Sequence, residues 1–143
     1  LVGIGGPNRY NLRNPFTLEE TEAMLKIALQ GADNVTLLPI PDLDDGPRWR
    51  EMVKQRFGPL NLFVTDNPYV SELMQPVYHV MRPVYFVSPD ERIPLNGTMV
   101  RLAMACGESW EALVEPDIAK YIKQNGLDSR FRKEFGLQAI AKG

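Results

Sequence analysis

The sequence predicts an α/β fold in which a parallel sheet carries helices on both faces. Short apolar runs at residues 1–4, 35–40 and 60–64 alternate with segments of helical spacing. These runs are apolar at consecutive positions, which is typical of strands covered on both faces. The chain has 143 residues, of which 44% are hydrophobic and 24% charged. That is enough for one domain over residues 1–143 with a buried core.

The first strand, predicted at residues 1–4, leads through glycine and proline into a polar loop over residues 7–16. Thr17 with Glu20 forms a capping-box pattern that predicts a helix from there to about Gln30, with Gly31 as its stop. The spacing of apolar and small residues predicts a buried face on this helix. Its members are Thr21, Met24, Leu25 and Ala28.

The middle of the chain repeats this order of strand, loop and helix. A strand over 35–40 precedes an acidic loop and a helix that opens at Pro47 and closes at Gly58. A strand over 60–64 precedes a short helix capped by Asn67. Residues 77–87 have strand composition but contain Pro83. They are either one strand that enters a loop or two short edge strands.

The last third of the chain is predicted to be helical. Asn96 caps a helix that runs through Cys106, and Pro116 opens another that Gly126 stops. A short helix at 109–113 lies between them. A final helix covers 128–135, and the tail after Gly136 is expected to be loose. The C-terminal helices at about 108–135 are expected to pack on the single domain.

Composition excludes several classes of function. The net charge of −2 argues against a broad nucleic-acid surface. No apolar run approaches the roughly eighteen residues of a membrane span. The single cysteine, Cys106, fits a reducing compartment such as the cytoplasm. Asp42, Asp44 and Asp45 fit a solvated turn better than a metal site because proline and glycine surround them.

Two short stretches resemble phosphate-binding loops. In the first, Gly5 and Gly6 precede Arg13 and Asn14. The second stretch contains Asn96, Gly97, Thr98 and Arg101. In both, a turn of small residues delivers the chain to a helix start with an arginine close by. Helix starts carry unpaired N–H groups and partial positive charge, so they favour phosphate. A nucleotide site built from distant parts of the chain is therefore predicted.

The order of several motifs resembles the archaeal-type nicotinamide-nucleotide adenylyltransferases of the His-x-Gly-His nucleotidyltransferase superfamily. The resemblance covers residues 1 to about 123 and implies a Rossmann-like parallel sheet. The motifs are Ile4-Gly5-Gly6-Pro7-Asn8, Arg13-Asn14-Pro15-Phe16-Thr17, Leu38-Pro39-Ile40-Pro41-Asp42, Trp49, Thr65-Asp66-Asn67-Pro68, Asn96-Gly97-Thr98-Met99-Val100-Arg101, and Trp110 with Leu113 and Pro116.

The resemblance implies adenylyl transfer from ATP, with Mg²⁺, to nicotinamide mononucleotide (NMN), giving NAD and pyrophosphate. It implies that Arg13 grips the NMN phosphate and that Trp49 stacks on nicotinamide. Asn67 would line the nucleotide pocket. Thr98 and Arg101 would hold the ATP phosphates as the catalytic pair. The resemblance also implies a homo-oligomer, and it implies neither a nucleic-acid partner nor a membrane partner.

The chain departs from the family pattern at several places. Its one histidine, His79, cannot supply His-x-Gly-His. Asn96 occupies the position of a serine in the family pattern, and Thr21 occupies that of an arginine. Gly6-Pro7-Asn8 replaces the usual Ser-Ala-Gln. Two alternatives therefore stay open. One is a sibling nucleotidyltransferase with another acceptor, and the other is a non-catalytic nucleotide-binding module.

A first strand and helix of the family pattern are also not in this sequence. A βαβ unit takes roughly 30 residues. We expect those residues to lie upstream of Leu1, because a domain without a central strand would expose unpaired sheet edges. The prediction of an enzyme is made on the condition that this upstream segment contains His-x-Gly-His. A true fragment is the alternative.

Overall fold

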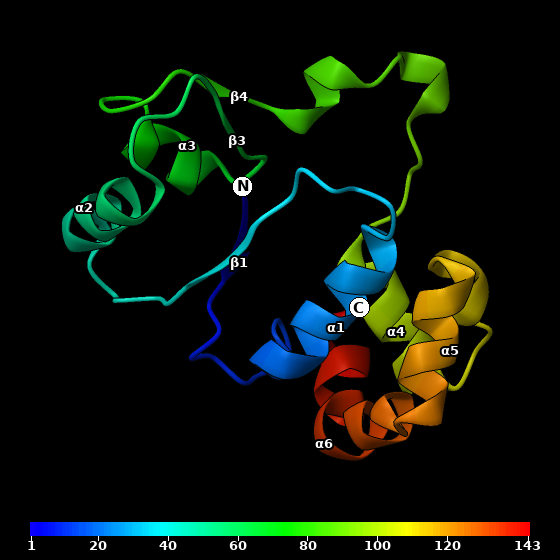
Figure 1. Ribbon diagram of the computed structural model, residues 1–143. Helices are drawn as coiled ribbons and strands as arrows, with labels where there is room; N and C mark the ends of the chain where they lie inside the picture. The colour runs from blue at the N-terminus through cyan, green and yellow to red at the C-terminus, as the bar shows by residue number, and fades with distance from the viewer. The chain divides into compact units, whose positions relative to one another are not determined.

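The computed structural model describes residues 1–143 and confirms the α/β class with parallel strands (Figure 1). The chain forms two compact units, one of residues 1–41 with 95–143 and the other of residues 42–94. Each unit contains one ladder of two parallel strands. Whether the two units make one domain stays a prediction.

The first unit begins with a βαβ arrangement. Strand β1 (Val2–Gly5) pairs in parallel with β2 (Leu37–Ile40), and helix α1 (Leu18–Ala28) connects them. Val2 lies opposite Leu37 and Gly5 opposite Ile40. Pro39 fits within β2 because that strand pairs on one side only. The β1 and β2 predictions are confirmed, although β2 begins two residues later than expected.

Helix α1 begins with the predicted capping box. The Thr17 side chain accepts from the Glu20 N–H, and the Glu20 carboxylate accepts from the Thr17 N–H. The helix ends at Ala28, before the predicted Gln30, and Gly31 has a φ of 87°. Burial of its inner face is only partial, because no residue of α1 is fully buried and Ala28 is exposed.

The remainder of the first unit is helical. Helix α4 (Gly97–Cys106) is followed by the 3₁₀ turn η3 (Glu111–Leu113), α5 (Pro116–Gln124) and α6 (Leu127–Lys142). Helix α6 packs on α4 and α5, and α5 packs on α1. Their core centres on the fully buried side chains of Met104, Trp110 and Phe131.

The prediction of a loose tail after Gly136 is wrong. Helix α6 continues to Lys142, and both Gly136 and Ala139 are buried. Glycine lowers helix propensity by about 1 kcal/mol, but tertiary packing supplies more than that. Leu127, Phe131 and Ala139 all belong to the core cluster, so the helix continues because its inner face is covered.

The second unit has a smaller ladder. Strand β3 (Phe63–Val64) pairs in parallel with β4 (Val80–Met81), and α3 (Pro68–Met74) connects them. Helix α2 (Gly46–Phe57) packs on α3. Pro83 opens the 3₁₀ turn η1 (Pro83–Phe86), so neither strand alternative for residues 77–87 holds beyond β4. A further turn, η2, spans Pro89–Glu91.

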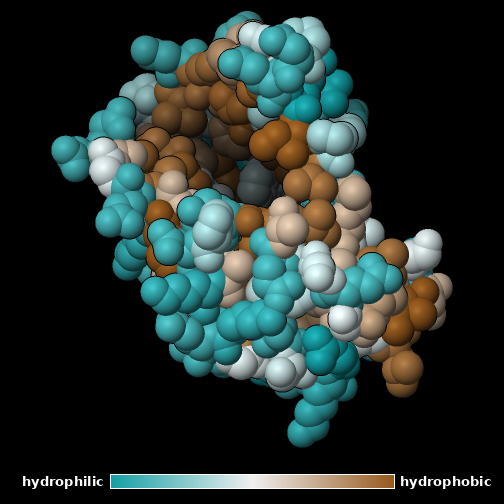
Figure 2. Space-filling view, turned by 90° about the vertical axis from the view of Figure 1, so that its right-hand side faces the viewer, coloured by the Kyte–Doolittle hydropathy of each residue, from teal (hydrophilic) through white to brown (hydrophobic).

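The surface carries hydrophobic residues among hydrophilic ones, as Figure 2 shows for one face. The most exposed large hydrophobic side chain is that of Leu137 on α6. No helix is both long enough and apolar enough to cross a membrane.

Candidate active site

The loop between β1 and α1 is folded into a tight turn around Arg13. The Asn11 side-chain oxygen accepts from the N–H groups of Arg13 (2.9 Å) and Asn14 (3.1 Å). The Asn11 N–H donates to the Asn14 carbonyl at 3.1 Å. Gly6 enters the loop with a φ of 61°, which disfavours other residues. A Cβ at Gly6 would lie 3.1 Å from the Asn14 side-chain nitrogen.

The second predicted loop forms the start of α4. The Asn96 side chain caps the helix by accepting from the N–H groups of Thr98 and Met99. Arg101, one turn further on, donates from Nη2 to the Thr98 hydroxyl at 3.2 Å. A Cβ on Gly97 would lie 2.8 Å from Arg101 Nη1. The guanidinium therefore lies over Gly97, folded back toward the helix start.

Two cavities in the first unit share Arg13 and Arg101. One, of about 350 Å³, also carries Gly5, Gly6, Asn14 and Gly97 on its wall, together with apolar side chains from α1, α4 and α5. The other, of about 400 Å³, carries Thr98. The tertiary structure thus brings the two predicted loops together around the arginine pair.

The arginine pair has no acidic partner. Neither guanidinium forms an ion pair with a carboxylate. Burial lowers the pKa of Arg101, and the neighbouring charge of Arg13 lowers it further. Two like charges in one pocket repel unless an anion lies between them. The geometry and charge of this site suit a phosphate or pyrophosphate group.

Two predicted residues, Trp49 and Asn67, belong to the second unit. Trp49 lies on α2 and is half-buried. Asn67 caps α3 and accepts from the N–H groups of Tyr69 and Val70, as predicted. Their roles toward a ligand stay predictions.

The sequence analysis missed three polar residues of the second cavity, which are Asn11, Gln138 and Lys142. Two of them lie on the part of α6 that was expected to be loose. A signal was present, because Leu127, Phe131, Phe135 and Ala139 recur at every fourth position. Lys142 adds a third cation to the wall that holds Arg13 and Arg101.

No group of three or more His, Cys, Asp or Glu side chains is arranged to hold a metal ion.

Known proteins with similar sequences are nicotinamide-nucleotide adenylyltransferases, and no protein-family model matches the chain. The enzyme of Picrophilus torridus is 32% identical over 135 residues, which cover 92% of this chain and 78% of that protein. The enzyme of Aeropyrum pernix is 30% identical over 140 residues, covering 93% and 79%. That of Methanococcus maripaludis strain C6 is 30% identical over 136 residues, covering 93% and 77%.

The α/β fold with parallel strands is that of a Rossmann-like nucleotidyltransferase. The similarity extends over most of this chain and more than three quarters of each of these relatives. The chain belongs to the family of nicotinamide-nucleotide adenylyltransferases. The predicted family and enzyme class are confirmed.

Proposed function

We propose that the protein transfers the adenylyl group of ATP to NMN, giving NAD and pyrophosphate. An oxygen of the NMN phosphate attacks the α-phosphorus of ATP, the bond to the β-phosphate oxygen breaks, and pyrophosphate leaves with Mg²⁺. The magnesium ion enters as part of the MgATP substrate. The observation that carries the proposal is the arginine pair, which lies beside the start of α4 without any carboxylate to neutralise it.

Each arginine has a distinct proposed role. Arg13 anchors the attacking phosphate of NMN. Arg101, with the Thr98 hydroxyl and the N–H groups at the start of α4, holds the leaving pyrophosphate. Transfer of this kind depends on positioning and charge neutralisation rather than on a covalent intermediate. Repulsion between two anionic substrates is reduced because both cations line the same cavities.

The remaining binding roles follow the family resemblance. Trp49 stacks on the nicotinamide ring, and Asn67 lines the nucleotide pocket. Gly5, Gly6 and Asn14 shape the wall on which Arg13 lies. The proposed partners are ATP and NMN, and the proposed assembly is a homo-oligomer.

The proposal is tested by comparing Arg13→Ala with Arg101→Ala. Loss of a charge-assisted contact costs roughly 2–4 kcal/mol. Arg13→Ala should therefore weaken NMN far more than ATP. Arg101→Ala should lower turnover by about two orders of magnitude, because its charge acts on the developing pyrophosphate. Isothermal titration with each ligand and an assay of NAD formation from MgATP and NMN measure these effects.

Lys133→Ala is the matched control, since Lys133 is an exposed cation on α6 that lines neither cavity. Equal losses of NMN and ATP affinity in Arg13→Ala would contradict the assigned role. Binding of both nucleotides without any turnover would favour the non-catalytic nucleotide-binding module.

A further inference from the structure

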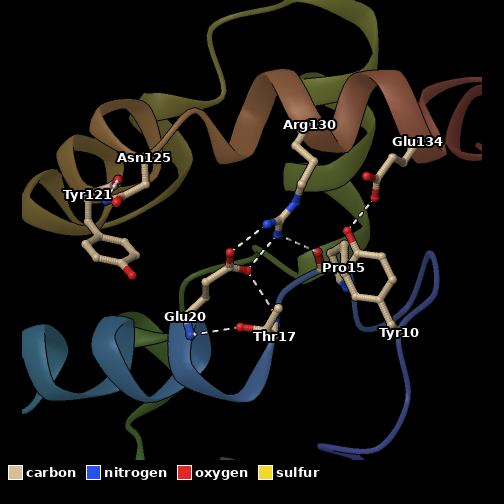
Figure 3. A network of polar contacts seen from close by, with 8 residues as sticks. All are labelled: Tyr10, Pro15, Thr17, Glu20, Tyr121, Asn125, Arg130 and Glu134. Atoms are coloured by element: carbon tan, nitrogen blue, oxygen red, sulfur yellow. Dashed lines mark hydrogen bonds and ion pairs between the residues drawn. The ribbon is translucent and has the colours of Figure 1, made fainter.

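The turn of residues 11–14, which carries Arg13, is fixed to α6 through Tyr10, the residue that precedes the turn. The Tyr10 hydroxyl donates to the Glu134 carboxylate (Figure 3). The Tyr10 ring meets the edge of the Phe135 ring at 5.4 Å between centroids. Burial raises the pKa of Tyr10, and the hydrogen bond to Glu134 raises it further, so the hydroxyl stays protonated at neutral pH. The amino-terminal end of the turn is thereby anchored.

Arg130 of α6 fixes the other end of the turn. Its Nη2 donates to the Pro15 carbonyl at 3.3 Å. The same guanidinium forms a two-pronged ion pair with Glu20, with Nη1–Oε1 and Nη2–Oε2 distances of 2.6 Å (Figure 3). It also lies over the Tyr10 ring, 5.8 Å from the centroid. One side chain therefore contacts both flanks of the turn and the first turn of α1.

The contact between Arg130 and Glu20 depends on the geometry of the two groups as well as on their charges. The side chains of Arg130 and Glu20 are only 30% and 17% exposed. The planar guanidinium satisfies both carboxylate oxygens and a carbonyl at once, which a lysine ammonium cannot do in the same geometry. The Glu20 carboxylate also accepts from the Thr17 N–H at 2.9 Å, which joins the ion pair to the capping box of α1.

The Arg13 side chain has no such support of its own. It is exposed, and the hydrogen bond that its residue makes is from the backbone N–H to Asn11. The position of its guanidinium therefore depends on the turn of residues 11–14, whose two flanks both meet Arg130.

We propose that Arg130 is the positioning residue for Arg13, so that it sets the affinity for the acceptor phosphate without touching it. This inference rests on the proposed function, in which Arg13 grips the phosphate of NMN. Arg130 lines neither cavity, so it acts through the turn. The pairing with Glu20 spans 110 residues of sequence, which ties the last helix of the chain to the site.

The test compares Arg130→Lys and Arg130→Gln with the unaltered protein, using NMN as the titrant. Lysine keeps the charge but lacks the two parallel N–H donors of the guanidinium, and glutamine lacks the charge as well. Both variants should therefore bind NMN about tenfold more weakly, because small displacements of a binding group carry large costs. Lys123→Gln is the matched control, because Lys123 forms an ion pair with Glu111 in the same unit, away from both cavities. It should bind NMN within about twofold of the unaltered protein.

A double-mutant cycle with Arg13→Ala separates positioning from a structural role. If Arg130 acts through Arg13, then Arg130→Lys should cost no further NMN affinity in the Arg13→Ala background. A tenfold loss that persists in that background would overturn the inference. Thermal melts of all variants show which of them remain folded. Should Arg130→Gln unfold, Arg130→Lys and Tyr10→Phe carry the test, the latter with a smaller loss.

The inference and the proposed function fail in different ways. If Arg13→Ala binds NMN more weakly while Arg130→Lys binds it normally, the positioning role of Arg130 is contradicted and the proposed function is not. Normal affinity in Arg13→Ala contradicts the proposed role of Arg13, and the positioning role with it.

Discussion

The two units of this protein contain the same parallel βαβ arrangement but differ in packing. The ladder of β1 and β2 is four residues long, whereas that of β3 and β4 is two. The helices of the first unit enclose a core that includes Trp110 and Phe131. The second unit fully buries only Val53 and Met74 among its hydrophobic side chains. The unit with the arginine pair is thus the better packed one.

This difference in packing shows which unit can hold charged side chains that no carboxylate neutralises. Two guanidinium groups in one pocket, without carboxylates, repel each other and destabilise the fold. The buried core of α4, α5 and α6 offsets that cost. The second unit has Tyr69, Tyr85 and Ile93 mostly exposed and no comparable core. A unit that holds like charges close together for a ligand needs well-packed side chains elsewhere to offset the repulsion between those charges.

The largest expected effect is on the core of the first unit. Phe131→Ala should lower the free energy of unfolding by about 3–5 kcal/mol, because a large buried side chain leaves a cavity. Val53→Ala in the second unit should cost less, since fewer buried atoms are removed. The protein has two tryptophans, Trp110 in the first unit and Trp49 in the second, so single-tryptophan variants report each unit in urea titrations. Equal losses from both substitutions would contradict the difference in packing.

A second prediction asks whether the second unit contributes to nucleotide binding. Stacking on an aromatic ring is worth about 1–3 kcal/mol per base. NMN should quench tryptophan fluorescence, and Trp49→Leu should abolish the quench while the circular dichroism spectrum stays native. Quenching that survives in Trp49→Leu would point to Trp110 and confine the acceptor to the first unit.

A third prediction separates binding from stability at the start of α4. Gly97→Ala should weaken pyrophosphate about tenfold, close to 1.4 kcal/mol. The added Cβ would meet Arg101 Nη1 at 2.8 Å and displace the guanidinium. Stability should be equal or higher, because alanine favours helix over glycine by roughly 0.5–1 kcal/mol. Gly136→Ala in α6, where a Cβ would meet Arg132 Cγ at 3.5 Å, is the control. Unchanged pyrophosphate affinity in Gly97→Ala would contradict the assignment of Arg101.

The smallest expected effect is on the stability of the first unit at acidic pH. The ion pair with Arg130 lowers the pKa of Glu20, so this carboxylate stabilises the first unit above its unfolded pKa of about 4.3. That contribution is lost as pH falls through the lowered pKa of the folded state. Between pH 5 and pH 3 the unaltered protein should lose about 1 kcal/mol more stability than Glu20→Gln. Urea titrations at each pH measure this, and parallel losses in both proteins would contradict it.

Local signals in the sequence predicted most helix boundaries correctly. The caps at Thr17, Asn67 and Asn96 and the left-handed glycine at Gly126 all lie where expected. Each of these features depends on hydrogen bonds between residues a few positions apart, so a short stretch of sequence is sufficient. The end of α6 was not predictable in this way, because glycine at position 136 is unfavourable locally and tolerated only in a packed helix.

The sequence by itself determined the alternation of strands and helices, the two loops with their arginines, and the membership of a nucleotidyltransferase family. Only the tertiary structure decided that Arg13 and Arg101 line the same cavities and that Arg130 contacts Tyr10 and Pro15 on either side of the turn around Arg13. The reason is distance along the chain. Glycine turns and helix caps are encoded within four residues, whereas the Glu20–Arg130 pair joins residues 110 positions apart and forms only when the helical core brings α1 and α6 together.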